Sequence, residues 1–400
     1  MTEELYKEML RYLTAGESHG PGLITVVEGM PAGVPVSLDA INQDLARRQS
    51  GYGRGGRMKI EKDRVQVLSG IRHGLTLGSP VALMVENRDW VNWTEVMSAE
   101  PVAAYSDVRA PQKVRTCPRP GHADLVGALK YDHQDLRNVL ERASARETTM
   151  RVAAGALAKQ LLAPFGITVA GHVRSIGPVA APEGAPLTAA EIRERAEASE
   201  VRCVDPEASA AMIAAIDGAK RDGDSLGGVV EVVAAGLPPG LGSHVHWDRK
   251  LDGALGAALL SIQAAKGVEI GDAFAGAAMR GSQVHDEIGW AGDRGYYRLS
   301  NRAGGLEGGM TTGMNLVARV AFKPIATLYK PLRTVEIDTH AESQADIERS
   351  DACAIPAAAV IAECATAFVL AQFLAEKLGG DSLAEMQAHY GAYLKRVTER

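Results

Sequence analysis

The chain has 400 residues, of which 46% are hydrophobic and 23% charged, a composition that is typical of a soluble globular protein and excludes intrinsic disorder. Its 43 lysines and arginines against 49 acidic residues give a net charge of -6, which argues against a nucleic-acid-binding protein. The first residues carry acids and no apolar segment, and the most apolar stretch, residues 352–362, is too short to span a bilayer. We therefore expect a cytoplasmic protein without a signal peptide or a membrane segment.

No metal site is expected. The four cysteines have no C-x-x-C spacing, which argues against a zinc site and against a disulfide framework. His244 and His246 are separated by one residue, but no third ligand is evident. On a strand, two such histidines form one surface face.

The first predicted elements form a strand–turn–helix unit. Residues 22–29 are predicted to form a strand that ends in the turn 29–33, and Asp39 is predicted to cap a helix over residues 39–48. The same order returns with a strand over 229–236, a turn over 236–240, and Asp248 ahead of a helical run over 249–265. This repetition suggests an internal duplication, with a coincidence of two common units as the alternative.

Two long helices are predicted to be buried. One runs from about residue 136 to 162 and stops at Pro164, and the other covers residues 356–378 and stops at two glycines. The second is apolar nearly all round, as expected for a helix enclosed by other layers. Glycine-punctuated strands between such helices favour an α+β fold with a helical core between two sheets. Only residues 180–200 look like an exposed excursion, so residues 1–400 are expected to form a single domain.

Basic residues gather in three places. Residues 47–59 and 108–123 contain arginines and lysines but no acid, and a third set lies on the helix predicted over 136–162. There, Arg142 and Arg146 are expected one turn apart on the same face. Arginine concentrated in a net-acidic protein indicates a site for a multiply charged anion, because guanidinium groups match carboxylate and phosphate oxygens. Solvated surface charge is the alternative.

Glycine-rich segments accompany these charges. Residues 51–56 match G-x-G-x-x-G, but a helix precedes them and a strand-like segment follows, which excludes a dinucleotide fingerprint and favours a loop that folds over an anion. His19 and His122 lie in glycine-rich loops, where an imidazole can protonate a leaving phosphate or a cofactor. A hydrogen-bonded structural histidine is the alternative for each. Residues 303–313 allow a flat ligand or a phosphate to approach the backbone closely.

Taken together, these motifs closely resemble the chorismate synthase family. The resemblance runs from about residue 10 to the C-terminus, in order, and rests on residues 11–23, 47–63, 119–131, 140–156, 304–313, 323–327 and 349–360. It implies a helical core between two antiparallel sheets, and usually a homotetramer. It also implies the last step of the shikimate pathway, in which 5-enolpyruvylshikimate 3-phosphate loses phosphate and a ring hydrogen to give chorismate. The family requires reduced FMN although no net oxidation occurs.

The resemblance also implies the residues of the site. His19 matches the acid beside the leaving phosphate, His122 the histidine beside the flavin, and Asp351 the carboxylate linked to the flavin's central nitrogen. The substrate carries a phosphate and two carboxylates, and the matching substrate-binding positions are Arg48, Arg54, Arg57, Arg119 and Arg146. The flavin-binding positions are Arg142, Ala143, Ser144, Gln263, Ala264, Gly308, Lys323, Pro324, Ile325, Ala326, Thr327 and Arg349.

Three alternatives accompany this interpretation. A flavin- or nicotinamide-dependent oxidoreductase acting on an anionic substrate would show net electron transfer. An RNA-binding module would use the Arg/Gly loop, but the net charge of -6 and the lack of interleaved aromatic residues count against it. Asp351 alone fits an N-cap of the following helix. No additional flavin-reductase domain is evident, so we expect an external flavin reductase, with NADPH only as an indirect reductant.

Overall fold

Two antiparallel sheets contain most of the strands. The computed structural model describes residues 10–55, 61–102, 113–292, 295–348 and 350–400, and every structural statement below concerns these residues. The strand order is β1-β2-β6-β3 in the first sheet and β10-β15-β9-β7-β8 in the second, and all neighbouring strands are antiparallel. The bounds are β1 (Arg11–Ala15), β2 (Gly22–Glu28), β3 (Gln66–Ser69), β6 (Val81–Glu86), β7 (Thr168–Ile176), β8 (Val179–Ala180), β9 (Gly228–Ala235), β10 (Ala265–Ile270) and β15 (Leu316–Phe322).

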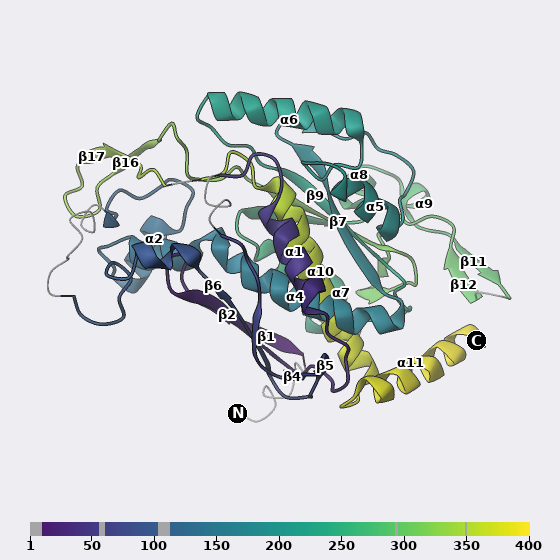
Figure 1. Ribbon diagram of the computed structural model, residues 1–400. Helices are drawn as coiled ribbons and strands as arrows, with labels where there is room; N and C mark the ends of the chain where they lie inside the picture. Colours follow the sequence, from purple (N-terminus) through teal and green to yellow (C-terminus); the bar gives the residue numbers. More distant parts are fainter. Residues whose placement is uncertain (1–9, 56–60, 103–112, 293–294, 349) are drawn as a thin grey trace.

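Two helices pack against each other, and each of them packs mainly against one sheet. α4 (Thr148–Leu162) lies against β2 and β6, and α10 (Ile355–Leu378) lies against β7 and β9 (Figure 1). α1 (Leu38–Gln49) contacts both helices, and α7 (Leu251–Leu260) contacts α10. A Cβ atom added to Gly155 of α4 would collide with Cys364 of α10, so the two helices approach as closely as glycine allows. The predicted mixed α+β fold is confirmed.

The α10 helix is the centre of the hydrophobic core. It begins at Ile355, with a proline in its first turn, and ends at Leu378 before Gly379, as its sequence pattern predicted. With 24 residues and a mean hydropathy of 1.9 it is long and apolar enough to cross a membrane, but 89% of that apolar window is buried inside the protein. Its apolar residues therefore pack against the other helices and the second sheet.

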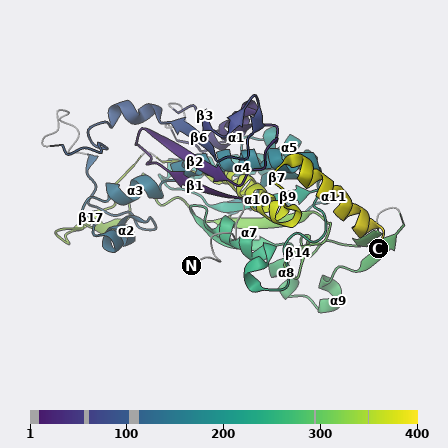
Figure 2. The same cartoon turned by 90° about the horizontal axis from the view of Figure 1, so that it is seen from below.

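The remaining elements connect these parts or cover their edges. α11 runs along the outside of the molecule to the C-terminus (Figures 1 and 2). The helices are α2 (Asp124–Tyr131), α3 (Arg137–Ala143), α5 (Ala189–Glu197), α6 (Pro206–Arg221), α8 (Ala273–Ala277), α9 (Gly281–Val284) and α11 (Leu383–Thr398), with the 3-10 turns η3 (Arg88–Asn92), η5 (Ala145–Glu147), η6 (Ala163–Phe165) and η7 (Trp247–Arg249). The short strands are β4 (Ile71–Arg72), β5 (Leu75–Thr76), β11 (Ile288–Ala291), β12 (Gly295–Arg298), β13 (Leu306–Glu307), β14 (Met310–Thr311), β16 (Arg333–Val335) and β17 (Glu342–Gln344).

The helix predicted over residues 136–162 is broken in the structure. Ser144 has a ψ of 142°, which is not helical, and it separates α3 from the turn η5 and from α4. Its hydroxyl oxygen accepts a hydrogen bond from the N–H of Arg146, as an N-cap residue does. Arg142 and Arg146 consequently do not share one helical face, and the prediction that they do is wrong.

Three smaller predictions are also corrected. Ser37 rather than Asp39 caps α1, because its hydroxyl oxygen accepts the N–H of Ala40. The helical run predicted over 249–265 ends at Leu260, and strand β10 begins at Ala265. The segment 180–200 is not exposed throughout, because it contains α5, which contacts β7 and buries Ile192.

The main elements of the two halves follow the same order. The first half contains β1, β2, α1, β3, β6 and α4, and the second contains β7, β9, α7, β10, β15 and α10, with the shorter elements between them. In both sheets the first strand of the half pairs with the second, the second with the fourth, and the fourth with the third. The two halves therefore share both an element order and a strand order.

Candidate functional site

Two of the expected substrate-binding arginines share one buried carboxylate. Arg48 lies in the last turn of α1 and Arg146 in η5. Nη2 of Arg48 lies 2.9 Å from Oδ2 of Asp63, and Nη1 of Arg146 lies 2.7 and 2.8 Å from the two carboxylate oxygens. All three side chains are buried. Nη2 of Arg146 also lies 3.6 Å from Oε2 of the buried Glu61, so two guanidinium groups and two carboxylates make up this group, the arginine cluster.

The arginine cluster is suited to an additional anion. Burial lowers the pKa of Arg48 to about 10, with Arg146 and Arg54 acting in the same direction and Asp63 in the opposite one, so Arg48 is still charged at neutral pH. Nε of Arg48 and Nη2 of Arg146 are buried and have no hydrogen-bond partner within the described residues. Because buried donors without a partner are costly, oxygens of an anionic ligand would stabilise both guanidinium groups.

His19 lies in the loop after β1 and is held by Glu141 of α3. Oε1 of Glu141 lies 2.9 Å from Nδ1 of His19, and Oε2 accepts the backbone N–H of His19 at 2.7 Å. The imidazole stacks on Trp93, with ring centroids 3.9 Å apart. Burial raises the pKa of Glu141, but the hydrogen bond from His19 and the neighbouring Arg137 outweigh burial and lower it. Glu141 is therefore an anion, and Nδ1 of His19 is engaged.

Asn87 places the loop of His19 beside the arginine cluster. Its Nδ2 donates to the carbonyl oxygens of Glu17 and Gly20, at 3.1 and 2.8 Å, on either side of His19. Its Oδ1 accepts a hydrogen bond from Nε of Arg146 at 3.0 Å. One amide thus joins the candidate acid to the candidate anion site.

A second group surrounds His122, at the start of α2. Asp124 accepts hydrogen bonds from Nε of Arg119, at 2.8 Å, and from Nδ1 of His122. Nη1 of Arg119 donates to the hydroxyl oxygen of Thr327 at 2.8 Å. Burial raises the pKa of Asp124, but the hydrogen bonds from His122 and Arg119 hold it well below its usual range. The expected residues Arg119, His122 and Thr327 are thereby brought together.

The other expected flavin-binding residues extend from this group. Nζ of Lys323 donates to the carbonyl oxygen of Gly121 at 2.8 Å, and its backbone N–H donates to that of Ala264 at 3.0 Å. Nε2 of Gln263 donates to Glu147 at 3.1 Å. Within the segment 323–327, the carbonyl oxygen of Ile325 accepts from Ser225. A continuous series of contacts therefore runs from the His122 loop to Gln263.

A hollow of about 430 Å³ lies at the Gln263 end of this series. It is lined by Tyr12, Leu13, Thr14, Arg142, Glu147, Arg151, Ser261 and Gln263. Arg142 donates to the carbonyl oxygens of Thr14 and Gly16, at 2.9 and 3.3 Å. Oε1 of Gln263, one of the lining residues, is buried and has no hydrogen-bond partner in the described part of the chain.

Asp351 is paired with Arg54 and does not cap the following helix. Nη1 of Arg54 lies 2.6 Å from Oδ2 of Asp351, and the backbone N–H of Gly55 lies 2.6 Å from Oδ1. The N-cap residue of α10 is Ala354, which makes no side-chain capping bond. The capping interpretation of Asp351 is therefore wrong. The charge of Arg54 also acts on Arg48, which places this pair near the arginine cluster.

Some expected residues are not joined to these groups. Arg57 and Arg349 lie outside the described residues. Ala143 and Ser144 follow Arg142 at the break between α3 and η5, and Pro324 and Ala326 lie in the segment beside Gly121. Gly308 lies in the turn between β13 and β14. A Cβ atom added to it would have only His244 and Met310 within 4 Å, so none of the other described site residues surrounds it.

The sequence interpretation missed the acids of the site. Asp63, Asp124 and Glu141 each bind a predicted arginine or histidine, and all three are buried. Each of these acids lies within a sequence motif that also contains predicted basic residues of the site. This position in the sequence could have identified it. A buried cation needs a nearby anion, so acids within such motifs are the first candidates.

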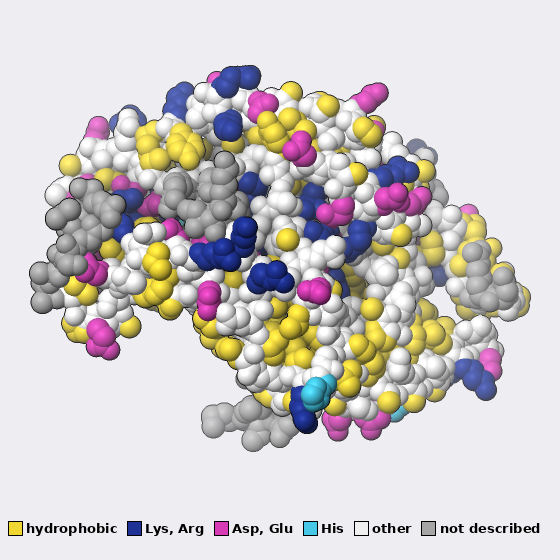
Figure 3. All heavy atoms as spheres, viewed as in Figure 1, with side chains coloured by type: hydrophobic (Ala, Val, Ile, Leu, Met, Phe, Trp, Pro, Cys, Tyr) yellow, Lys and Arg dark blue, Asp and Glu magenta, His cyan; other side chains and the backbone are white. Residues whose placement is uncertain are grey.

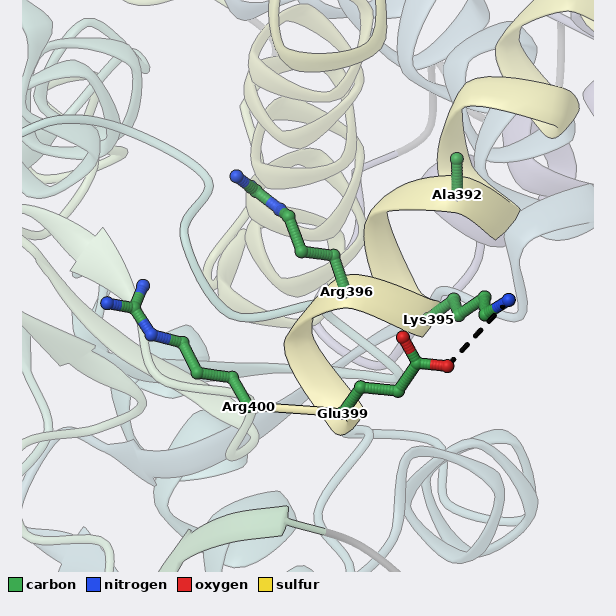
Figure 4. A pocket seen from close by; sticks show the side chains of 5 residues that line it. All are labelled: Ala392, Lys395, Arg396, Glu399 and Arg400. Atoms are coloured by element: carbon green, nitrogen blue, oxygen red, sulfur yellow. Dashed lines mark ion pairs between the residues drawn. The ribbon is translucent and has the colours of Figure 1, made fainter.

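Two further features are not part of the candidate site. His244 and His246 lie between β9 and η7 and not on a strand, and Nδ1 of His246 pairs with Asp248; among the described residues no group of three potential metal ligands occurs. A hollow of about 540 Å³ at the end of α11 is lined by Ala392, Lys395, Arg396, Glu399 and Arg400 (Figure 4). All five residues come from one helix end, and no expected site residue is among them. On the face in Figure 3, by contrast, basic side chains gather near the middle of the molecule.

Comparisons with known proteins identify the family of this chain. Residues 10–375 match the family model of chorismate synthase. The chain is 78% identical over 391 residues to the chorismate synthase of Symbiobacterium thermophilum, covering 98% of this chain and 100% of that protein. It is 60% identical over 374 residues to chorismate synthase 1 of Bacillus thuringiensis, covering 94% and 96%. A crystal structure of chorismate synthase matches with a TM-score of 0.79 and 43% identity, covering 98% of this chain and 99% of that one. The chain belongs to the chorismate synthase family.

Proposed function

We propose that this protein is a phosphate-lyase that converts 5-enolpyruvylshikimate 3-phosphate to chorismate, the last step of the shikimate pathway. The single observation that carries this function is the buried arginine cluster beside His19, joined through Asn87. The substrate has a phosphate and two carboxylates, and the cluster has two buried guanidinium donors without a hydrogen-bond partner in the described residues. Arg48, Arg54, Arg57, Arg119 and Arg146 bind the anionic groups of the substrate.

In this proposal His19 is the general acid. Nδ1 is bound to Glu141, so Nε2 is the nitrogen that reaches the leaving group. As the carbon–oxygen bond breaks, the electron pair stays on the phosphate oxygen, and the proton of Nε2 moves to the phosphate. The guanidinium groups stabilise the charge that develops on the phosphate as it departs.

Reduced FMN is the proposed cofactor, and the residues present fit it. The buried acceptor Oε1 of Gln263 needs a donor such as a ring N–H or a ribityl hydroxyl group, and Arg142 and Lys323 provide cations for the phosphate. Gly121, with a φ of 81°, has no side chain that would keep a flat ring from the backbone. When bound, reduced FMN supplies electron density as the phosphate leaves and recovers it when the ring hydrogen is removed, without net oxidation.

The other flavin-binding positions follow the family pattern. They are Ala143, Ser144, Ala264, Gly308, Pro324, Ile325, Ala326, Thr327 and Arg349. His122 is proposed to keep the reduced ring suitably protonated, with its Nδ1 held by Asp124. Asp351 is proposed to accept the proton from the central nitrogen of the ring, and it is paired with Arg54 before that step.

We also propose the architecture and the setting of the enzyme. Residues 1–400 form one domain in which a helical core lies between two sheets; the support is that buried residues of both sheets belong to one hydrophobic cluster with α4 and α10. The shared strand order of the two halves supports an internal duplication. A cytoplasmic homotetramer is proposed, with an external reductase that uses NADPH indirectly, and with neither nucleic acid nor a membrane as partner.

Anaerobic turnover tests this function. The purified protein is mixed with the phosphorylated substrate and photoreduced FMN, and chorismate, phosphate and the flavin spectrum are followed together. We expect equal amounts of chorismate and phosphate, with the flavin reduced at the end. Oxidation of one flavin per product molecule would instead identify an oxidoreductase.

A further inference from the structure

One buried residue, Glu141, accepts hydrogen bonds from four donors around the candidate acid, three of them at its carboxylate. Its two oxygens lie 2.9 and 3.0 Å from Nδ1 of His19, and Oε2 accepts the backbone N–H of the same residue at 2.7 Å. Oε1 also accepts a hydrogen bond from Nη1 of Arg137 at 2.7 Å. The backbone carbonyl of Glu141 accepts the N–H of Ser18 at 3.1 Å. The side chain of Glu141 is 1% exposed, so water does not compete for these contacts.

We propose that Glu141 is the positioning residue for His19: it keeps the proton of the neutral ring on Nδ1 and leaves Nε2 as the nitrogen that faces the leaving phosphate. This inference rests on the proposed function and adds to it a residue that touches neither the substrate nor the cofactor.

The contacts of the ring explain how the position is maintained. An imidazole can rotate so that either nitrogen approaches a partner, and its tautomer follows the hydrogen bond that one nitrogen makes. Here the carboxylate selects Nδ1, while Trp93 stacks on the ring and prevents it from tilting. Arg137 and Lys113 lie over the same tryptophan, at 4.8 and 4.4 Å from the ring centroid. Within the described residues Nε2 has no hydrogen-bond partner, so it is available to a ligand.

Glu141 also matters for the proton transfer. Before the transfer the ring carries a proton on each nitrogen, and the proton on Nδ1 faces Glu141. Afterwards the Nε2 proton belongs to the phosphate, and the neutral ring retains the proton on Nδ1 that faces Glu141. The ring of His19 has the same orientation before and after the transfer, so Nε2 can take up its next proton without a rotation of the ring.

The second histidine of the site has the same arrangement. Asp124 binds Nδ1 of His122, accepts hydrogen bonds from the guanidinium of Arg119, and accepts the backbone N–H of Arg119 at 3.2 Å. Each histidine is thus paired with one buried carboxylate that also binds an arginine and a backbone N–H. Two separate loops with one arrangement favour a role in orienting the ring over a chance structural contact.

Glu141→Gln removes the charge with little change in volume. A glutamine at this position has one oxygen, and either orientation directs its NH₂ group at an N–H donor, of Arg137 or of the His19 backbone. Glu141→Asp keeps the charge but shortens the side chain by one methylene. Glu28→Gln is the matched control, because Glu28 forms an exposed ion pair with Arg11 on the first sheet.

Two measurements are made on each variant. In the ligand-free protein, ¹⁵N NMR of labelled histidine reports the tautomer of His19, with His19→Asn used to assign its signals. Anaerobic kinetics with the phosphorylated substrate then give kcat and KM separately. A melting curve confirms that each variant is folded.

In the wild-type protein and in Glu28→Gln, we expect the neutral ring of His19 to carry its proton on Nδ1. In Glu141→Gln we expect a mixture of tautomers and a kcat lowered by about 10²–10⁴-fold, the scale of a lost general acid, with KM changed much less. Glu141→Asp should recover part of kcat. A wild-type tautomer, or a wild-type kcat, in Glu141→Gln overturns the proposal.

The two readouts separate this inference from the proposed function. If Glu141→Gln does not fold, Glu141→Asp decides: an altered tautomer with a lowered kcat supports the positioning role, and wild-type values overturn it. If the wild-type protein fails to form chorismate, the proposed function is wrong, whereas the NMR spectra still show whether Glu141 controls the ring of His19.

Discussion

Arg54 and Asp351, which are 297 residues apart in the chain, form an ion pair with Nη1 2.6 Å from Oδ2. The backbone N–H of Gly55 donates to the other oxygen of Asp351, so the carboxylate binds both the side chain of Arg54 and the backbone of the next residue. The backbone N–H of Ala352 also donates to the carbonyl oxygen of Gly53 at 2.9 Å. The loop that carries Arg54, a proposed substrate-binding residue, is therefore attached to the segment that leads into α10. The proposed base, Asp351, must act while it is paired with that arginine.

Asp351→Asn tests the role of the base. Asparagine can still accept the N–H of Gly55, but it cannot take up a proton. We expect folding and FMN binding close to wild type, and turnover slowed by at least about 10²-fold. The measurements are anaerobic turnover, FMN titration and a melting curve.

The control for Asp351→Asn is Asp217→Asn. Asp217 accepts a hydrogen bond from the hydroxyl of Tyr52 in the same loop, at 2.8 Å, and lies on α6 outside the proposed site. Turnover of this control should be close to wild type. Full turnover of Asp351→Asn would remove Asp351 from the catalytic residues.

Neighbouring arginines on α1 should behave differently when they are changed. Arg48 is part of the arginine cluster, whereas Arg47 forms a bidentate pair with Glu363 of α10, at 2.9 and 3.0 Å. Arg48→Ala should weaken substrate binding by about 1.5–3 kcal/mol, the contribution of a hydrogen bond to a charged group. Arg47→Met should chiefly lower the free energy of unfolding, by about 1.5–3 kcal/mol, because Glu363 loses a bidentate partner but keeps Lys159 and Arg193. Calorimetric titration and chemical denaturation distinguish the two. Equal effects on binding would contradict the assignment.

The helix predictions succeeded where the signal is local. α10 is apolar throughout and is bounded by a proline and two glycines, so its limits could be predicted from the sequence. The break at Ser144 has no such signal, because no glycine or proline marks it. Arg142 on one side of the break binds the backbone near Thr14, and Arg146 on the other side binds Asp63. The two sides of the break are thus attached to parts of the chain that lie far from it in sequence.

The same reason explains what was missed in the site. A histidine or an arginine in a glycine-rich motif suggests binding or catalysis by its own chemistry. Asp124 lies two residues from His122 in one motif, but Glu141, which binds His19, comes from another segment 122 residues away. Such pairings depend on tertiary packing and do not follow from the spacing of residues within a motif.

The two histidines should have separable roles. His19→Ala should slow chorismate formation by about 10²–10⁴-fold, since the leaving phosphate loses its acid. His122→Ala should mainly change the spectrum and the protonation of bound reduced FMN. Stopped-flow absorbance of flavin and product follows both effects. If the alanine variant of either histidine forms chorismate at the wild-type rate, that histidine has only a structural role.

A lower pH should destabilise the second sheet because the carboxylate of Glu231 becomes protonated. Burial raises the pKa of this residue, but His172 and Arg319 on the adjacent strands outweigh burial and lower it from 4.5 to about 2. Because the pKa in the folded state lies below that of the unfolded chain, the stabilisation is complete above about pH 4.5 and is lost as the pH falls towards 2. Glu231→Gln should cost up to about 3 kcal/mol at pH 7 and flatten this part of the stability profile.

Denaturation of Glu231→Gln at several pH values tests this expectation. Glu28→Gln, which removes an exposed carboxylate, is the control and should change the free energy of unfolding by less than about 1 kcal/mol. An acid profile of Glu231→Gln that runs parallel to that of the wild type would contradict the role of this carboxylate.

Gly155→Ala tests the close contact of α4 and α10. A Cβ atom at Gly155 would collide with the Cβ atom, carbonyl carbon and carbonyl oxygen of Cys364, and these backbone atoms cannot move alone. Alanine favours a helix over glycine by about 1 kcal/mol, but separating two packed helices costs about 1–3 kcal/mol or more. We expect net destabilisation and a weaker response to phosphate or substrate in a melting experiment.

Gly256→Ala on α7 is the matched control: nothing lies within 4 Å of the added atom, so only the helix preference remains and the protein should become more stable. If both variants are stabilised, the two helices have room between them, and the contact at Gly155 does not determine how they pack.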